Sequence, residues 1–269
     1  MRSLSMLKKV RYTAAGLSQE YPFHLPWLSA IEDLDFHQPL TFLVGNNGVG
    51  KSTLIQALAI QTQIPQLTNA PYEDDPSYTA LLAFANRLKT EWDVKSKSGF
   101  FFRADDFISF VRENERLRHE LQAELASLDQ QGVPKLSFQR QPYENSLAAL
   151  KRTYPKALHT LSHGQSFLAL FKSRLAPNSF YLLDEPETPL SPQNQLALLQ
   201  MIDDQIKQGA QFIIASHSPI LTAHPEAVIY EISDTHIAPI DYDEIENVSF
   251  MKHFMSDPQR FMYYMLENQ

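Results

Sequence analysis

The residues with the clearest chemical potential form a glycine-rich loop between an apolar run and a helical pattern. Gly45-Asn-Asn-Gly-Val-Gly-Lys-Ser-Thr53 has the form GxxxxGK[ST], and it holds three of the chain's eight glycines. Glycine lets the backbone curl until successive N–H groups point at phosphate oxygens, and the following helix adds the positive end of its dipole. The pattern predicts a triphosphate site whose binding residues are Asn46, Asn47, Gly48, Val49, Gly50, Lys51, Ser52 and Thr53.

Two carboxylates form the second element of the predicted site. The run Phe180-Tyr-Leu-Leu-Asp-Glu185 is apolar until it ends in Asp184 and Glu185. Ligands of a parallel sheet lie beyond the C-terminal ends of its strands, where a carboxylate can hold Mg²⁺. We expect Asp184 and the Ser52 hydroxyl to hold Mg²⁺, Lys51 to contact the β- and γ-phosphates, and Glu185 to accept a proton from the attacking water. The alternative is a solvated strand end.

A histidine follows another apolar run, Gln211-Phe-Ile-Ile-Ala-Ser-His217. If this strand lies beside the carboxylate strand, His217 faces the same ligand and can hydrogen-bond the γ-phosphate and orient Glu185. The predicted catalytic residues are therefore Glu185, His217 and Lys51. A lone histidine is more often structural, and the other eight histidines show no metal-ligand spacing.

Short apolar runs alternate with helical patterns along the chain. The expected strands are Leu7–Tyr12, Leu40–Val44, Phe100–Phe102, Phe180–Leu183 and Gln211–Ala215, and the expected helices are Ser52–Ile60, Ser77–Leu88, 107–131 and about Gly164–Leu175. A further helix begins at Pro192 after the N-cap Ser191, with Leu196, Leu199, Ile202 and Ile206 on its buried face. Residues 13–33 and 61–78 are expected to be irregular, and no clear pattern assigns 134–160.

This alternation predicts an α/β fold with a mainly parallel central sheet, antiparallel N-terminal strands and a helical insertion. Residues 1–103 and 161–240 would form the core, residues 104–160 the insertion, and residues 241–269 a C-terminal helical segment. The insertion is either a partner surface or a solvated helix packed on the core. The apolar side chains of 250–269 are expected to pack rather than to form a docking face.

Composition limits the classes of protein that fit. The chain has 269 residues, 43% of them hydrophobic, and a net charge of −8, which does not attract nucleic acid or anionic lipid to the chain as a whole. It has no cysteine, no apolar stretch of a signal peptide at its start and no run long enough to span a membrane. A cytoplasmic protein without a membrane span is therefore expected.

Four segments together resemble the motifs of the ATP-binding cassette (ABC) ATPases, most closely the small SMC/RecF-like branch often labelled AAA-family predicted ATPases. In the family's order they are Gly45–Thr53, Leu161-Ser-His-Gly-Gln-Ser166, Leu182-Leu-Asp-Glu-Pro-Glu187 and Ala215-Ser-His-Ser-Pro219. The resemblance spans roughly residues 20–235. It implies a P-loop NTPase fold of the ABC type, with a RecA-like lobe, that hydrolyses ATP with Mg²⁺.

The resemblance also implies a second copy of the chain. Leu161–Gln165 resembles the signature motif, usually Leu-Ser-Gly-Gly-Gln, which in the family contacts ATP held by another protomer. The residues acting in trans would be Ser162, His163, Gly164 and Gln165, and ATP would drive a head-to-tail homodimer. His163 replaces the first glycine of the motif, and an ordinary helix cap at Ser162 is the alternative.

Other family elements are less evident. No glutamine clearly matches the Q-loop, so Arg103 or Asp105 is a candidate nucleotide sensor, and Glu187–Ser191 falls at the D-loop with a different sequence. Tyr21, Phe23 and Trp27 are candidates for stacking on adenine, and core packing is an equal alternative for each.

Several functions fit these observations. The favoured one is an ATPase whose ATP-driven dimerisation controls a separate effector protein. The alternatives are the nucleotide-binding subunit of an ABC transporter and a DNA-repair-associated ATPase, although the charge does not favour nucleic acid. An SMC-like bridging machine needs a longer coiled coil than 107–131, which spans roughly 37 Å. A sensor without hydrolysis is disfavoured by the intact candidate catalytic residues.

Overall fold

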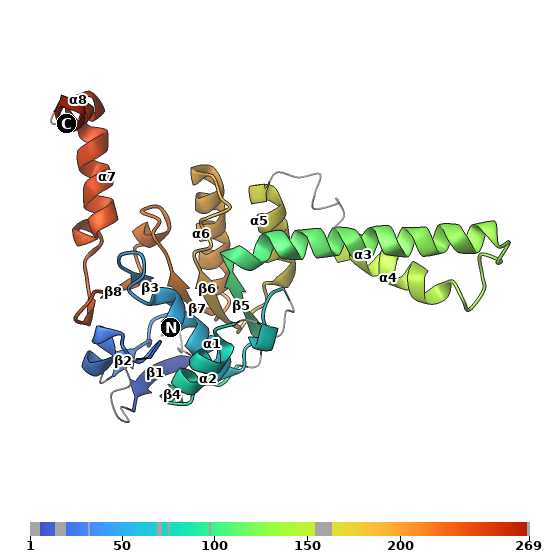
Figure 1. The fold of residues 1–269 in the computed structure, drawn as a ribbon, viewed down its shortest axis with the longest axis horizontal. Coiled ribbons are helices and arrows are strands. Elements are labelled where there is room, and N and C mark those ends of the chain that lie inside the picture. The colour runs from blue at the N-terminus through green and yellow to red at the C-terminus, as the bar shows by residue number, and fades with distance from the viewer. Residues whose placement is uncertain are drawn as a thin grey trace.

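A six-stranded sheet forms the centre of the molecule (Figure 1). The computed structural model describes residues 6–13, 20–31, 33–68, 72–74, 76–96, 98–153 and 163–267. The strand order is β5-β6-β7-β3-β8-β9, and every neighbouring pair is parallel except β8 and β9. The strands are β3 (Leu40–Val44), β5 (Gly99–Arg103), β6 (Phe180–Asp184), β7 (Gln211–Ala215), β8 (Val228–Ile232) and β9 (Ile237–Pro239). The predicted α/β fold with a mainly parallel sheet is confirmed.

A second, antiparallel sheet has the order β2-β1-β4 and consists of β1 (Leu7–Tyr12), β2 (Leu34–Asp35) and β4 (Leu88–Trp92). The expected antiparallel N-terminal strands are present, but the helix expected at Ser77–Leu88 is too long. Helix α2 (Tyr78–Ala85) ends earlier, and Leu88 opens β4 instead. The reason is a change of period, because Leu88 is buried while Lys89 and Glu91 alternate outward.

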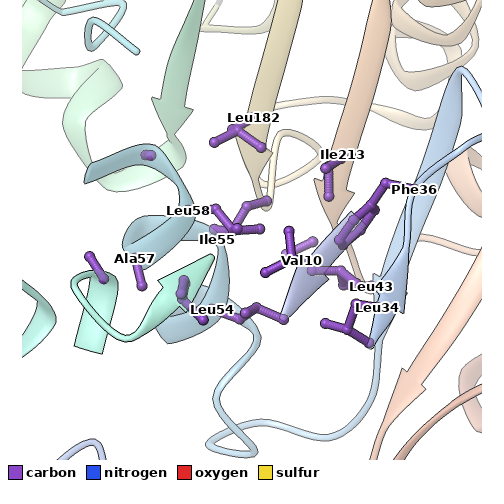
Figure 2. Packing of buried hydrophobic residues seen from close by; sticks show 14 of the residues in the cluster. Val10, Leu34, Phe36, Leu43, Leu54, Ile55, Ala57, Leu58, Leu182 and Ile213 are labelled. Atoms are coloured by element: carbon purple, nitrogen blue, oxygen red, sulfur yellow. The ribbon is translucent and has the colours of Figure 1, made fainter. Parts of the chain in front are cut away.

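Helices cover both faces of the central sheet. Helix α1 (Lys51–Thr62), α2 and the small sheet pack on one face, and α5 (His163–Arg174) and α6 (Pro192–Ile206) on the other. Because successive side chains of a strand point to opposite faces, Leu43 enters the first layer and Phe42 the second. Figure 2 shows Leu43 among side chains from α1, β1 and β7. The core thus packs on both faces of the strands that lead to the predicted site.

The buried face of α6 differs from the expected one in one residue. Leu198, Ile202 and Ile206 are buried one turn apart, and Leu199 is partly buried beside them. Leu196 is 58% exposed, so its assignment to the buried face is wrong. The buried stripe follows i, i+4, i+8 from Leu198. Leu196 lies two residues earlier, on the opposite side of the helix, and therefore faces away from the core.

The insertion is a helical hairpin of α3 (Ala104–Gln130) and α4 (Gln141–Thr153), the latter within the segment that had no assignment. Figure 1 shows α3 extending well beyond the sheet with α4 beside it. Phe107 and Phe110 fix the first turns of α3 in the core. Arg140 fixes the far end, because its buried side chain pairs with Asp129 at 2.6 Å and Glu144 at 3.1 Å. Packing on the core therefore holds only for the base of the hairpin.

The chain ends in α7 (Glu246–Ser256) and α8 (Pro258–Glu267), which stand away from the body in Figure 1. Helix α8 begins at Pro258, and Asp257 caps it by accepting from the N–H of Arg260 at 3.0 Å. The expectation that this segment packs is wrong, since most of its large apolar side chains are exposed. Short 3-10 turns lie at Pro26–Ala30, Tyr72–Asp74, Leu221–Ala223 and Tyr242–Glu244. No helix in the described ranges is long and apolar enough to cross a membrane.

One buried amide joins the two sheets. Gln211, the first residue of β7, is 1% exposed, and its Oε1 accepts from the N–H groups of Met6 (3.1 Å) and Leu7 (2.7 Å). Its Nε2 donates to the carbonyls of Leu7 (2.9 Å) and Phe36 (2.5 Å). The side chain therefore satisfies backbone groups of β1 and of the segment after β2 that no strand pairing satisfies.

Replacing this amide should be costly. Gln211→Ala leaves several backbone groups buried without partners, at about 1 kcal/mol or more each, so the free energy of unfolding should fall by roughly 3 kcal/mol. Urea unfolding followed by circular dichroism measures the change. Gln200→Ala, on the exposed side of α6, is the matched control and should change stability by less than about 0.5 kcal/mol. Equal stabilities for the two variants would contradict the role of Gln211.

Candidate functional site

The sheet brings the three predicted motifs to one edge. Strand β7 lies between β3 and β6, with Leu43 and Asp184 both in register with Ala215. The condition set for His217 is therefore met, because its strand is the direct neighbour of the carboxylate strand. The loop after β3, the carboxylates after β6 and the histidine after β7 begin side by side at the C-terminal edge, where parallel sheets bind ligands.

The glycine loop has the backbone that its composition predicted. Gly48 and Gly50 have φ values of 82° and 102°, which L-residues with side chains rarely adopt. Space also excludes a side chain at Gly50, since a Cβ there would lie 2.9 Å from the Trp27 ring. The Lys51 side chain is folded under the loop, and its Nζ donates to the carbonyls of Gly45 and Asn46 at 2.9 Å each. Burial lowers the pKa of Lys51, and the nearby carboxylates oppose that shift.

The aromatic residues before the loop have separate positions. Trp27 is fully buried, and its Nε1 donates to the carbonyl of Val49 within the loop. Phe23 packs against Phe84, with the Arg87 guanidinium 4.0 Å above its ring. Trp27 is therefore a packing residue that supports the loop, and adenine stacking does not fit it. Tyr21 is 42% exposed with its hydroxyl 3.0 Å from Thr53 Oγ1, so it stays a stacking candidate.

The predicted magnesium ligands lie in contact. Ser52 Oγ donates to Asp184 Oδ1 at 2.9 Å, and Asp184 is 4% exposed. Burial raises the pKa of Asp184 to about 7, while the hydrogen bond from Ser52 favours the charged form. Gln56, one turn after Ser52 on α1, also hydrogen-bonds this carboxylate; the i, i+4 spacing could have revealed it.

These oxygens suit Mg²⁺. A hydroxyl and a carboxylate are hard ligands, and Mg²⁺ keeps several waters and binds one or two protein groups together with substrate phosphates. Across the described residues no group of three or more histidine, aspartate or glutamate side chains could hold a metal on its own. The donor set therefore fits a cation that arrives with a phosphate ligand rather than a permanently enclosed ion.

Glu185 adopts a left-handed backbone, with φ of 49°, and its N–H donates to the carbonyl of Ala215 at 2.9 Å. This backbone differs from the extended one of Asp184, the last residue of β6. Glu185 Oε1 lies 3.6 Å from Nε2 of His217, and the two side chains are 40% and 26% exposed. Burial, and then repulsion from Lys51, lower the pKa of His217. His217 Nε2 is buried and has no hydrogen-bond partner among the described residues.

Glu187 is a residue of the site that the motif search left without a role. Its Oε1 accepts from the N–H of His217 at 2.6 Å, and the Ser216 hydroxyl bonds the same carboxylate. Its Oε2 is buried and has no hydrogen-bond partner among the described atoms, and burial raises the pKa of the group. Glu187 therefore holds the backbone of His217 in place. A third carboxylate after Asp184 and Glu185 was the available signal.

The candidate signature lies partly within the described chain. Helix α5 is described from His163 onward, and Leu161 and Ser162 lie outside the described residues, so the signature role stays a prediction. Gly164 is buried, and a Cβ there would lie 2.3 Å from Asn194 Nδ2 of α6, so the glycine permits close helix packing. Gln165 is exposed. Because α5 precedes β6 and returns the chain to the start of that strand, its N-terminus points toward the nucleotide-site edge.

The candidate sensor residues lie at the end of β5. Arg103 is in register with Asp184 and pairs with Asp106 at 2.8 Å, and its charge helps to lower the pKa of Asp184. Asp105 is exposed in the first turn of α3. Arg103 is therefore close enough to the site to respond to its charge, and a sensing role for either residue stays a prediction.

A parallel sheet with a glycine loop, a lysine under that loop and a serine bonded to a buried aspartate defines a P-loop nucleotide-binding protein. The model of the family described as "AAA domain, putative AbiEii toxin, Type IV TA system" matches residues 71–223, and a further AAA domain model matches residues 27–62. The cobalt import ATP-binding protein CbiO of Salmonella paratyphi A is 31% identical over 208 residues, which cover 75% of this chain and 68% of that protein. The chain belongs to the ABC-type ATPases.

Other similar proteins are more distant. A putative ABC transporter ATP-binding protein of Caldanaerobacter subterraneus is 26% identical over 72% of this chain and 77% of its own length. Among solved structures, cbiO1 from Clostridium perfringens covers 97% of this chain and 98% of its own, at 18% identity and a TM-score of 0.48. The SMC head domain from Thermotoga maritima covers 88% and 99%, at 15% identity and a TM-score of 0.43.

The support that Trp27 provides to the loop should be measurable as nucleotide affinity. Trp27→Phe removes the hydrogen bond to Val49 and part of the surface against Gly50, so the Kd for ATP should rise roughly tenfold. Isothermal titration calorimetry gives the Kd. The chain's other tryptophan supplies the control, because Trp92 packs on Phe180 away from the loop and Trp92→Phe should bind ATP like the wild type. A normal Kd for Trp27→Phe would contradict this role.

The buried Asp184 should destabilise the protein as it ionises. Its folded pKa of about 7 lies above the unfolded value of 3.8, so its contribution to stability is full below pH 4 and is lost as the pH rises toward 7. Asp184→Asn keeps an acceptor for Ser52 without this charge. In metal-free buffer its free energy of unfolding should therefore be a few kcal/mol higher than that of the wild type at pH 8. At pH 4 the two values should be equal. Urea titrations at the two pH values give the difference, and a constant difference would refute the shift.

Proposed function

We propose that the chain is a Mg²⁺-dependent ATPase that dimerises head to tail on ATP and controls a separate effector protein in the cytoplasm. The observation that carries this proposal is the convergence of Lys51, the Ser52–Asp184 pair and the Glu185–His217 pair at one sheet edge. The family membership of the chain supports the same reaction.

The phosphates would bind to the loop through backbone N–H groups and the N-terminus of α1. Lys51, which now donates to loop carbonyls, would exchange those bonds for phosphate oxygens. Mg²⁺ held by Ser52 and Asp184 would neutralise charge on the phosphates. Burial of the site would strengthen each of these contacts, because it excludes the water that would otherwise screen them.

Glu185 would accept the proton of the attacking water. Its exposed carboxylate stands beside His217, whose lowered pKa favours the neutral imidazole at physiological pH. The buried Nε2 of His217 would then donate to the γ-phosphate as its missing hydrogen-bond partner. Glu187 fixes the backbone of His217, so the imidazole can hold both the phosphate and Glu185 in place.

A second copy would complete each nucleotide site. The N-terminus of α5 offers backbone donors and a positive dipole end, and Ser162 to Gln165 would place them against ATP bound to the other protomer. Two copies related by a two-fold axis would bury two ATP molecules. Hydrolysis would then release the dimer, and a partner that recognises only the dimer would be switched off.

A second candidate function is the nucleotide-binding subunit of an ABC transporter. The observation that favours it is the similarity to proteins named as cobalt import and transporter ATP-binding proteins. A transporter subunit depends on its membrane partner for full activity. ATP-dependent dimerisation and steady hydrolysis by the isolated chain would favour the first function.

The direct test uses the variant that should trap ATP. Glu185→Gln removes the proposed base and should lower kcat by about 10²- to 10⁴-fold while leaving ATP binding intact. Light scattering should therefore show this variant as a monomer alone and a dimer with Mg-ATP. The double variant Glu185→Gln, Lys51→Ala is the control, because it should lose ATP and stay monomeric. If Glu185→Gln binds ATP and stays monomeric, the head-to-tail proposal is wrong.

A further inference from the structure

The C-terminal arm, defined as α7 and α8 (Glu246–Glu267), is rooted at the nucleotide site. Val248 in its first turn is buried in the core, and Asn247 Nδ2 donates to the carbonyl of His217 at 3.3 Å. The same first turn lines a small cavity together with Gly45, Asn46 and His217. The root of the arm is therefore in contact with the loop that carries the candidate catalytic histidine.

In the outer part of the arm, aromatic rings pack on one another, but most large apolar side chains are exposed. The rings of Phe250, Phe254 and Phe261 pack on one another, with centroids 5.5 to 6.4 Å apart, and this fixes the bend between α7 and α8. Large apolar side chains on both helices are nevertheless exposed by 40% to 65%: Phe250, Met251, Met255, Met262, Tyr263, Tyr264, Met265 and Leu266. Such a concentration of exposed apolar surface marks an interaction site.

Charge argues against a lipid surface as the occupant. The described arm carries two basic residues, Lys252 and Arg260, against three acidic ones, Glu246, Asp257 and Glu267, and the whole chain has a net charge of −8. Helices that lie on anionic membranes need a basic face. A nearly neutral, methionine-rich surface is instead typical of contacts between proteins.

The strand order places the arm and the α3–α4 hairpin at opposite ends of the central sheet. The arm follows β9 at one end of the central sheet, and the α3–α4 hairpin follows β5 at the other end. The glycine loop follows β3 toward the arm's end, whereas α5 enters β6 toward the hairpin's end. In Figure 1 the arm stands on one side of the body, and the hairpin extends from the opposite side.

A two-fold axis that places α5 of one copy over the glycine loop of the other must therefore reverse these ends. The β5 end of the second copy then lies over the β9 end of the first. The hairpin of the second copy comes to the side from which the arm projects, and by symmetry the same contact forms twice. Helix α3 has an exposed apolar side chain on each of two opposite sides, Ile108 and Leu117, and the side that faces the arm contributes one of them.

We propose that the C-terminal arm docks on the α3–α4 hairpin of a second copy when ATP closes the dimer. The inference rests on the proposed head-to-tail dimer and adds a contact outside the nucleotide sites. The root of the arm bonds His217, and its outer part would bind the other copy. The contact would therefore link the presence of the γ-phosphate to the stability of the dimer. The occupant of the apolar surface is thus this chain itself.

The absence of cysteine in the chain allows a direct mapping experiment. Met265→Cys is introduced into Glu185→Gln and labelled with benzophenone maleimide, and the sample is irradiated with and without Mg-ATP. Partner chains that carry no benzophenone but are enriched in ¹⁵N are mixed in, so that mass spectrometry distinguishes cross-links between copies from those within one copy. With ATP we expect adducts within 104–153 of the other copy, and without ATP none. Val94→Cys, on the exposed loop after β4, is the control and should give no such adduct.

A second measurement tests the energetic share of the arm. A triple variant in the Glu185→Gln background replaces exposed methionines only: Met255→Gln, Met262→Gln and Met265→Gln. The thermal unfolding of its monomer should therefore not change. The dimer dissociation constant in Mg-ATP should rise roughly tenfold or more by analytical ultracentrifugation. Leu196→Gln, on the exposed side of α6, is the matched apolar-to-polar control.

The outcomes separate the two proposals. A dimer in Mg-ATP with adducts outside the hairpin, or with the methionine variant as tight as its parent, overturns the arm contact and leaves the head-to-tail dimer standing; the surface would then serve the effector. The absence of any dimer, with ATP bound, overturns both. ATP-dependent adducts on the hairpin with a weakened methionine variant establish the contact.

Discussion

The position of β7 between β3 and β6 is the constraint on which the rest of the structure depends. Its parallel register with both neighbours starts the glycine loop, the carboxylates and the histidine at one edge. At its other end, Gln211 bonds the backbone of β1 and the segment after β2, and thereby holds the small sheet against the central one. Trp27 packs in the same hydrophobic cluster as that sheet and supports the glycine loop through its bond to Val49. A single strand of five residues thus orders the site from two directions.

The site is assembled at an electrostatic cost. Asp184 and Glu187 lie at positions where burial raises their pKa values, and Lys51 lies where burial lowers its own. Hydrogen bonds from Ser52 and Ser216, and the mutual attraction of Lys51 and the carboxylates, offset only part of that cost. A ligand that supplies phosphate charge to the lysine and a cation to the aspartate would complete the balance, so the empty protein should be less stable than the complex. This is the expected behaviour of a site shaped for its ligand rather than for folding.

The sequence predicts what depends on local pattern and misses what depends on distant contacts. The glycine loop with its flanking strand and helix was located correctly, because motif, period and turn chemistry all act within about twenty residues. Strand β4 was hidden, since Leu88 continues the apolar spacing of α2 and its partner β1 is almost eighty residues away. Leu196 was placed inside because a leucine at helical spacing was taken as core, whereas tertiary packing selected Leu198. Glu187 acts through the backbone of His217, thirty residues later, so the third carboxylate of its motif indicates a role but not the group that it holds.

The C-terminal arm shows a different limit of sequence reasoning, because apolar composition predicts burial without naming the surface that provides it. Within one chain, α7 buries Val248 in the core, and the rest of the described arm packs its Phe250, Phe254 and Phe261 rings on one another while its methionines are exposed. A peripheral segment with no role would gain solubility from polar side chains at these positions. Its root is instead bonded to the backbone of His217, so a surface that holds the arm would act beside the candidate site. In the proposed dimer a second copy would both bury the methionines and respond to nucleotide, because ATP would bring the two copies together.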